Sequence, residues 1–247
     1  MPYIQTSGVV LRCTAYSDTS QVAAISTPDL GQIHVLAKGA YRPRKDGRTP
    51  LDVLTHVDLV LAMRAAGQLH ILADWTLREG FSAVRSSLDA FWSGCYAAEA
   101  VLALTTETPD DGEAYDHLLT LLRGLESATD ARKSLWTFVM RLLRTVGSLP
   151  VVDACADCGG PLSEHVRFSP RKGGAICESC VRPDSDAFSI SRGALAIMGR
   201  LAGNDGKSPM LRVTGKQSDE IQRAFDEQIK YHLGRPLRAS RFLAHVF

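Results

Sequence analysis

Cys155-Ala156-Asp157-Cys158 and Cys177-Glu178-Ser179-Cys180 are two C-x-x-C pairs, separated by eighteen residues. This spacing is typical of a four-thiolate zinc site, in which each pair bends into a knuckle whose sulfurs point at one ion. Gly173-Gly174 offers a place for the linker to reverse. Because four thiolates leave no coordination position for water, we predict one structural zinc ion. The predicted ligands are Cys155, Cys158, Cys177 and Cys180; the alternative is redox dithiols or unliganded cysteines.

Charge is balanced over the whole chain but not along it. The 247 residues carry a formal net charge of +1, whereas residues 185–247 hold ten basic and six acidic side chains. Residues 81–150 hold six basic and nine acidic side chains, so a polyanion is expected to meet the two ends of the chain. The first residues show no basic region followed by an apolar run, and six cysteines fit a reducing compartment. We therefore expect a cytoplasmic protein with no membrane segment.

Residues 1–80 are predicted to form a barrel domain. Short runs rich in Val, Ile and Leu alternate with turn signals such as Thr27-Pro28-Asp29-Leu30-Gly31. The predicted strands lie near residues 3–12, 21–26, 32–38, 53–63 and 68–75. Five short strands favour a barrel of the oligonucleotide-binding (OB) type, and an SH3-like barrel is the alternative.

A basic segment, residues 38–50, follows the third predicted strand. It combines five cations, one acid and one tyrosine with glycines and prolines that disfavour a helix. Cations can contact phosphates and an aromatic ring can stack on an unpaired base, so we predict nucleic-acid contact here. The alternative is a solvated surface loop; Tyr16 and Trp75 are expected in the barrel core or rim. The candidate residues of the segment are Lys38, Tyr41, Arg42, Arg44, Lys45 and Arg48.

The rest of the chain reads as helices around the cysteine pairs, which makes the protein an α+β structure. Residues 81–150 form the first part of a helical bundle, residues 151–184 a zinc-binding insertion, and residues 185–247 the second part of the bundle. The first helix is expected to have one apolar face from Val84 and Leu88 to Leu102, and the last is expected to start near Ser218-Asp219-Glu220. No nucleophile elbow, phosphate-binding glycine loop or zinc-hydrolase histidine pair occurs, so we expect a protein that is not an enzyme.

Several segments in this order resemble the bacterial RecO family of recombination mediators. They are Gly8-Val9-Val10-Leu11-Arg12, the turn at 27–31, Ala37-Lys38-Gly39-Ala40, the two cysteine pairs, and Tyr231-His232-Leu233-Gly234-Arg235-Pro236-Leu237-Arg238. The resemblance covers essentially the whole chain. It implies an OB domain, a helical domain and a zinc-binding insertion. It also implies a nucleoid-associated DNA repair factor that binds single- and double-stranded DNA, anneals strands and, with RecR, helps RecA replace single-stranded DNA-binding protein (SSB).

The resemblance places Lys38 and Arg42 on the basic turn where the family meets DNA, with Arg44, Lys45 and Arg48 extending it. From this turn we expect a binding track toward Arg235, Arg238 and Arg241. One alternative is a zinc-stabilised adaptor whose basic helical end binds an acidic peptide, such as the C-terminal tail of SSB, with DNA binding secondary. A zinc-dependent nucleic-acid enzyme is a third hypothesis, which a closed metal site disfavours.

Overall fold

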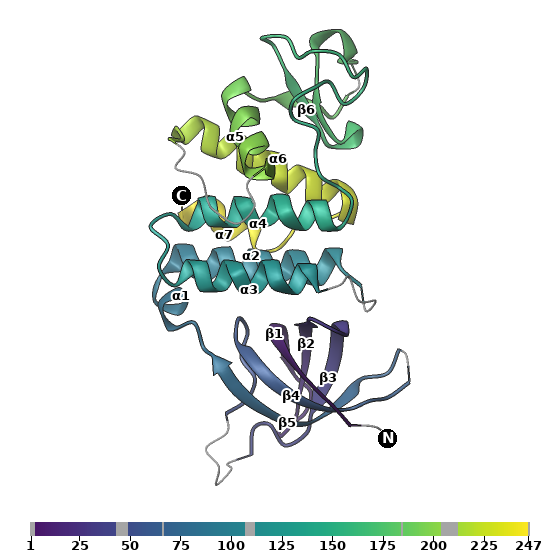
Figure 1. Cartoon of the computed structure of the whole chain (residues 1–247), viewed down its shortest axis with the longest axis vertical. Coiled ribbons are helices and arrows are strands. Elements are labelled where there is room, and N and C mark those ends of the chain that lie inside the picture. Colours follow the sequence, from purple (N-terminus) through teal and green to yellow (C-terminus); the bar gives the residue numbers. More distant parts are fainter. Residues whose placement is uncertain are drawn as a thin grey trace. The chain divides into compact units, whose positions relative to one another are not determined.

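A computed structural model describes the protein over residues 3–42, 49–65, 67–106, 112–183, 185–203 and 212–246 (Figure 1). The chain divides into two compact units: residues 1–132 together with 241–247, and residues 133–240. The domain boundaries expected at residues 80, 150 and 184 stay a prediction.

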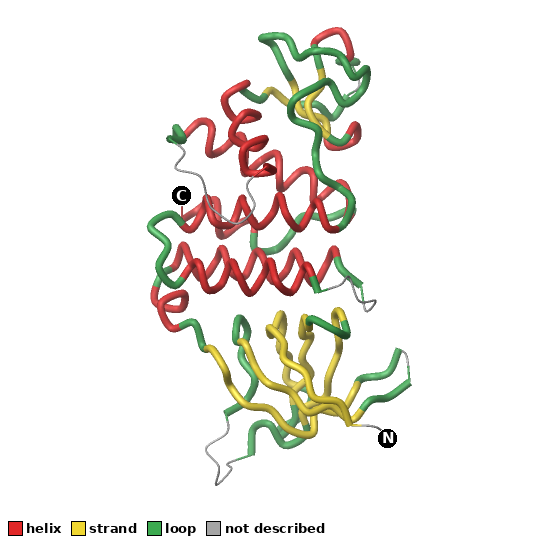
Figure 2. Tube along the Cα trace, viewed as in Figure 1, coloured by secondary structure: helices red, strands yellow, loops and turns green. Residues whose placement is uncertain are grey.

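The five strands of the first unit close into a barrel (Figure 2). They are β1 (Tyr3–Ala15), β2 (Gln21–Thr27), β3 (Gly31–Ala37), β4 (His56–Ala62) and β5 (His70–Glu79). The order around the barrel is β1-β2-β3-β5-β4, and every pair is antiparallel except β3 with β5. A closed five-stranded barrel of this kind is the OB type. The predicted fold class, α+β with an N-terminal OB-type barrel, is confirmed.

Strand β1 closes the barrel because it pairs with two neighbours. Val9 lies opposite Ser26 of β2 and also opposite His56 of β4, and the register with β2 shifts between Val10 and Arg12. Such a shift bends a strand and increases its twist. Gly8 permits the tight closure, since a Cβ there would lie 2.5 Å from the Ile25 side chain. A larger residue at this position would require its neighbours to move.

The barrel interior follows the alternation read from the sequence. Ile33, Val35 and Ala37 of β3 are buried, whereas His34 and Leu36 are half-buried. Trp75 completes the interior and donates its indole N–H to the carbonyl oxygen of Thr49 at 3.1 Å. The buried cluster among the described residues consists of Val10, Ala23, Ile25, Ile33, Val35, Ala37, Ala40, Leu51, Val57, Leu59, Leu61, Leu72 and Trp75.

The described helices that directly follow the barrel are α1 (Ser82–Ser86), α2 (Leu88–Leu104) and α3 (Glu113–Leu125). The predicted apolar face is wrong at its start, because Val84 and Leu88 lie on separate helices and Leu88 is exposed, whereas Ala98 is buried and Leu102 half-buried as expected. Ser87 is extended and caps α2 by accepting a hydrogen bond from the Ala90 N–H, and Leu88 is 70% exposed. The fully buried side of α2 consists mostly of small residues, with Tyr96 as the large exception, and it packs closely: a Cβ on Gly94 would lie 2.8 Å from Leu54.

A hydrogen-bonded network joins the barrel to α3 within this unit. His56 is 1% exposed, and its Nδ1 lies 2.7 Å from Oε1 of Glu79 while its Nε2 lies 2.9 Å from the Tyr115 hydroxyl. Arg123 of α3 donates two hydrogen bonds to the Glu79 carboxylate. The bond from Arg123 and that from His56 lower the pKa of Glu79 to about 2, although burial opposes the shift. The last residue of β5 is therefore fixed as a carboxylate.

The second unit contains most of α4 (Ala131–Thr145), α5 (Arg192–Gly203) and α6 (Gly215–Leu233). The Trp136 indole on α4 donates to the Gln222 side chain on α6 at 3.1 Å. Helix α6 begins earlier than predicted: Thr214 and Gln217 form a capping box, and Ser218 is buried inside the helix. Thr214 precedes Gln217 by three residues, which is the spacing a capping box requires. A last helix, α7 (Ser240–Val246), which belongs to the first unit from Arg241 on, was not predicted.

A small three-stranded sheet of the order β7-β6-β8 also lies in the second unit. Its elements are β6 (Arg167–Ser169), a 3₁₀ turn at Pro170–Lys172, β7 (Gly174–Ile176), a second 3₁₀ turn at Glu178–Cys180, and β8 (Phe188–Ser189). The predicted reversal at Gly173-Gly174 is confirmed, since Gly173 has a φ of 74° between β6 and β7. None of the helices in the described residues is long and apolar enough to span a membrane.

Candidate metal centre and nucleic-acid interface

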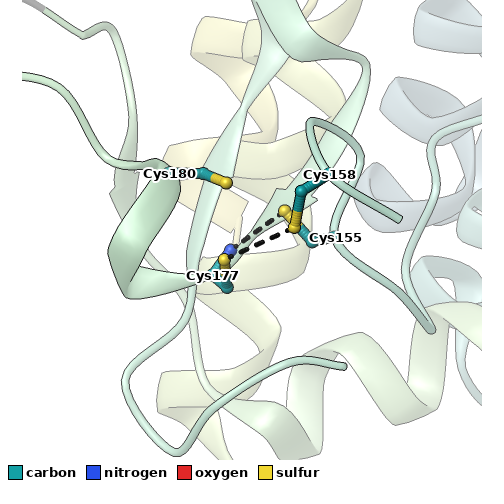
Figure 3. A group of neighbouring side chains, drawn as sticks. All are labelled: Cys155, Cys158, Cys177 and Cys180. Atoms are coloured by element: carbon teal, nitrogen blue, oxygen red, sulfur yellow. Dashed lines mark hydrogen bonds between the residues drawn. The ribbon is translucent and has the colours of Figure 1, made fainter. Parts of the chain in front are cut away.

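The four predicted cysteines come together in the cysteine module, which we define as residues 151–183 (Figure 3). Their sulfur atoms all lie within 4.8 Å of one another, and those of Cys158 and Cys177 are 3.9 Å apart. Zinc–sulfur bonds of about 2.3 Å in a tetrahedron require sulfurs about 3.8 Å apart. The cluster therefore has the size and the donor atoms to hold one metal ion.

Main-chain turns position the two knuckles. The Gly159 N–H donates to the carbonyl oxygen of Cys155 at 2.8 Å, and Gly159 has a φ of 72° that suits glycine. In the second knuckle the Cys180 N–H donates to the carbonyl oxygen of Cys177 at 3.0 Å. The Cys177 N–H in turn donates to Sγ of Cys155 at 3.4 Å, which ties one knuckle to the other.

Groups around the sulfurs support the knuckles. Asp157, between the first two cysteines, forms an ion pair with Lys172 at 2.5 Å, and the sequence alone did not identify this pair. The Cys177 sulfur lies 3.1 Å from the Ser179 hydroxyl. Gly174 lies against Val151, where a Cβ would approach the carbonyl oxygen of Val151 to 2.2 Å. The Asp157–Lys172 pair thus joins the first knuckle to the 3₁₀ turn between β6 and β7.

The proton affinities of the module's thiols differ from one another. Burial raises the pKa of Cys155, but main-chain N–H groups, that of Cys177 foremost, outweigh it and lower the pKa to about 6. The hydrogen bond with Ser179 lowers the pKa of Cys177. Contacts with the sulfurs of Cys177 and Cys158 raise the pKa of Cys180. Four sulfurs this close cannot all carry negative charge without a cation among them.

The other two cysteines belong to a different chemical class. Cys13 and Cys95 are half-buried in the first unit. Burial raises the pKa of the Cys13 thiol to about 12 and that of Cys95 to about 11. Both thiols stay protonated at neutral pH, as expected for packing residues rather than metal ligands.

The predicted nucleic-acid residues of the barrel segment that the structure describes lie at one end of the barrel. Lys38, Tyr41 and Arg42 are exposed after β3, and Gly39 has a φ of 68° that turns the chain there. The Tyr41 N–H donates to the carbonyl oxygen of Thr19 at 3.2 Å. The other residues predicted in this loop, Arg44, Lys45 and Arg48, lie outside the described residues.

Tyr16 joins this surface although the sequence favoured a place in the barrel core or rim. It lies in the turn between β1 and β2, where its N–H donates to the carbonyl oxygen of Ser20 at 2.9 Å, and its side chain is 65% exposed. Trp75, the other aromatic considered, is buried in the core as expected. We call Tyr16, Lys38, Tyr41 and Arg42 the basic-aromatic end of the barrel.

The predicted residues near the C-terminus fall into both units. Arg235 and Arg238 are exposed in the second unit, just after α6, whereas Arg241 is exposed in the first. The Arg241 guanidinium lies over the Phe242 ring at 4.6 Å, and that ring stacks on Trp92 at 3.9 Å between centroids. A track from Lys38 to these arginines stays a prediction.

The fold and the site define a class: an OB-type barrel followed by a helical region that carries a four-cysteine cluster able to hold a metal ion. A family model described as Recombination protein O N terminal matches residues 1–81, and one described as Recombination protein O C terminal matches residues 85–241. The chain belongs to the recombination protein O family, as the resemblance of its motifs predicted.

Relatives with similar sequences cover nearly the full length. The DNA repair protein RecO of Anaeromyxobacter dehalogenans is 30% identical over 251 residues, which span 100% of this chain and 98% of the relative. That of Symbiobacterium thermophilum is 30% identical over 248 residues, spanning 98% and 97%. The DNA repair protein RecO of Pelotomaculum thermopropionicum is 27% identical over 244 residues, spanning 98% and 94%.

Proposed function

We propose that the protein is a DNA-binding recombination mediator that acts in DNA repair and performs no enzymatic chemistry. It binds and anneals DNA strands and, with RecR, helps load RecA onto SSB-coated single-stranded DNA. The observation that carries this proposal is the basic-aromatic end of the barrel in a chain of the recombination protein O family. The names of its relatives, which are DNA repair proteins, support the same role.

DNA binding would use two kinds of contact at this end. Lys38 and Arg42 supply positive charge for phosphates, and binding there releases condensed counterions. Tyr16 and Tyr41 offer exposed rings on which unpaired bases can stack, a contact that tolerates any sequence. Neutralising phosphates on two strands lets them approach each other, which accounts for annealing without nucleotide hydrolysis.

We propose that the cysteine module holds one structural zinc ion. All four donors are thiols at distances that suit a tetrahedral ion, and four thiolates exclude water from coordination. Zinc bound in this way supplies folding free energy and no reaction. The residues that would hold it are Cys155, Cys158, Cys177 and Cys180, with Asp157 and Lys172 fixing the first knuckle.

The end of α6 favours a second candidate function, that of a protein adaptor. Tyr231 is 51% exposed there, and Arg235 and Arg238 are exposed directly after it. An aromatic ring beside two cations suits an acidic peptide with apolar residues, such as the C-terminal tail of SSB. The two functions are compatible, because the basic-aromatic end and the end of α6 belong to different units of the chain.

Annealing of two complementary labelled oligonucleotides tests the first candidate. The zinc-loaded full-length protein, without nucleotide, is expected to accelerate annealing. The acceleration should fall as salt rises from about 50 to about 200 mM, a range over which a protein with about six to ten phosphate contacts loses roughly 10³- to 10⁵-fold in affinity. No acceleration together with no DNA binding at low salt would reject the mediator proposal. Binding of an acidic SSB-tail peptide in the same preparation would then favour the adaptor.

A further inference from the structure

A cavity of about 620 Å³ opens beside the C-terminal half of β5 in the first unit. Its volume lies within the range of sites that bind ligands. Trp75 and Leu77 of β5 form one wall, Leu51 and Asp52 form another, and Arg85 of α1 borders it. Leu77 is 57% exposed, so a large apolar side chain stands at the cavity without a covering layer among the described residues.

One edge of β5 is open next to this cavity. Strand β3 pairs with β5 only at His70–Leu72, whereas β4 pairs with β5 as far as Glu79. In the part of the chain that the structure describes, no strand lies along the other edge of Thr76–Arg78. An open strand edge presents main-chain N–H and C=O groups at the spacing that another strand requires.

The walls of the cavity are held in place by hydrogen bonds. The Arg85 guanidinium donates to the carbonyl oxygens of Gly80 and Val53, at 3.1 and 2.5 Å, and pairs with Asp52 at 2.9 Å. The Glu126 carboxylate accepts from two N–H groups in the first turn of α1. A surface that is already rigid loses little entropy when it binds a partner.

Hydrogen bonds also hold residues 49–51, which line the cavity opposite β5. The Gln21 side chain accepts from the N–H of Leu51 at 3.1 Å and donates to its carbonyl oxygen at 2.8 Å. The Trp75 indole holds the carbonyl oxygen of Thr49. The segment that faces β5 across the cavity is therefore anchored at residues 49 and 51.

Charge distinguishes this cavity from the basic-aromatic end. The Asp52 side chain is 64% exposed, whereas Arg85 is 31% exposed and already donates to three acceptors. Within this ion pair the carboxylate is the more exposed partner, so its free lone pairs can accept a further hydrogen bond from a lysine or arginine. An apolar wall, an open strand edge and an exposed carboxylate together match an extended peptide and not a nucleic acid.

We propose that the open edge of β5 is a docking site for an extended segment of a partner protein. The segment adds as a strand along Thr76–Arg78, places an apolar side chain between Leu77 and Trp75, and sets a lysine or arginine against Asp52. Strand addition supplies affinity through main-chain hydrogen bonds, and the cavity and the carboxylate supply specificity. This site goes beyond the proposed DNA function and does not depend on it.

Selection of displayed random 12-residue peptides on the full-length, zinc-loaded protein tests the site. We expect enriched peptides in which apolar residues alternate and a lysine or arginine recurs. Their affinity, measured by fluorescence anisotropy, should fall at least tenfold for Leu77→Asp. Leu88→Asp is the matched control, because Leu88 is also a largely exposed leucine of the first unit. The peptides should bind this variant as tightly as they bind the wild type. Equal circular dichroism spectra and melting temperatures establish that both variants are folded.

Two further measurements test the mode of binding. Alternate main-chain nitrogens of the best peptide are methylated in two sets, the odd and the even positions. Methylation of the set that faces β5 should weaken binding at least tenfold. Peptide binding should also slow amide hydrogen exchange in residues 76–78. Asp52→Asn should abolish the preference for a basic residue. The proposal is overturned if the selection enriches no peptides, or if the peptides bind Leu77→Asp as tightly as they bind the wild type. It is also overturned if neither set of methylated nitrogens weakens binding. A thymidine oligonucleotide whose binding is weakened by Leu77→Asp would assign the cavity to DNA and also overturn it.

Discussion

The barrel and the cysteine module are both small β structures, but different forces hold them. Among the described residues, the barrel cluster comprises thirteen buried apolar side chains, and its hydrogen-bond ladder closes on itself. The cluster beside the knuckles comprises three buried residues, two of which are cysteines. The module also buries Val166, Phe168 and Ala175, but its interior is small beside that of the barrel, so we expect ligation to supply much of its folding free energy. The barrel should therefore fold by itself, whereas the module should depend on its metal.

Removal of the metal should produce the largest effect and the sharpest contrast. Chelation, or Cys155→Ser, is expected to unfold the cysteine module, because structural zinc can contribute about 10 kcal/mol or more to folding. Amide exchange in residues 155–180 should become fast while that in β2 and β3 stays slow. Cys13→Ser is the control and should retain one metal ion per chain. Slow exchange in a metal-free module would contradict the comparison.

Truncation of a side chain in the barrel core should have the next largest effect. It should destabilise the barrel and leave the cysteine module unchanged. Leu61→Ala removes a fully buried side chain and is expected to cost about 3 kcal/mol of unfolding free energy. Amide exchange should accelerate throughout the barrel, with the metal content unchanged. Leu77→Ala, at an exposed position of the neighbouring strand β5, should cost less than about 0.5 kcal/mol. Similar costs for the two variants would contradict the assigned core.

The carboxylate that ends β5 should give a smaller, pH-dependent effect. The folded pKa of Glu79 is about 2, below the value of about 4.3 expected in the unfolded chain. Between these values the unfolded state binds more protons, so the contribution of Glu79 is fully present above about pH 4.3 and is lost as pH falls toward 2.

Urea unfolding at several pH values measures this contribution. Glu79→Gln should lower stability at neutral pH and flatten the decline between pH 4.5 and 2. Asp18→Asn, which removes an exposed carboxylate from the same unit, is the control for the loss of one negative charge. An unchanged decline in Glu79→Gln would show that the bonds to Arg123 and His56 do not couple folding to this proton.

The sequence predicted those parts of the molecule that depend on local patterns. Alternating apolar residues located the strands, and spacing alone identified the four cysteines that gather in space. The buried face of α2 was predicted from its large apolar residues, such as Leu88. The close contact is instead made at Gly94, whose lack of a side chain lets the helix approach Leu54. The start of α6 was misplaced because Ser218 resembles a cap, yet Thr214 has the required glutamine three residues later.

Other features depend on the tertiary fold and could not be read from the chain. His56, Glu79 and Arg123 are far apart in sequence and meet only when the barrel has closed and α3 has packed against it. The exposure of Tyr16 beside the turn that leads to Tyr41 follows from main-chain bonds between two loops. The open edge of β5 exists because β3 ends at Ala37, a boundary that residue types do not mark.

The salt dependence of single-stranded DNA affinity tests the central claim most directly. For the variant Lys38→Ala with Arg42→Ala, the account predicts weaker binding and a slope of log affinity against log salt that is shallower by about 1.4, because two phosphate contacts are lost. A matched variant, Arg64→Ala with Arg200→Ala, removes two exposed cations elsewhere and should retain the wild-type slope. A wild-type slope in the folded Lys38 and Arg42 variant would contradict the claim that this end of the barrel binds DNA.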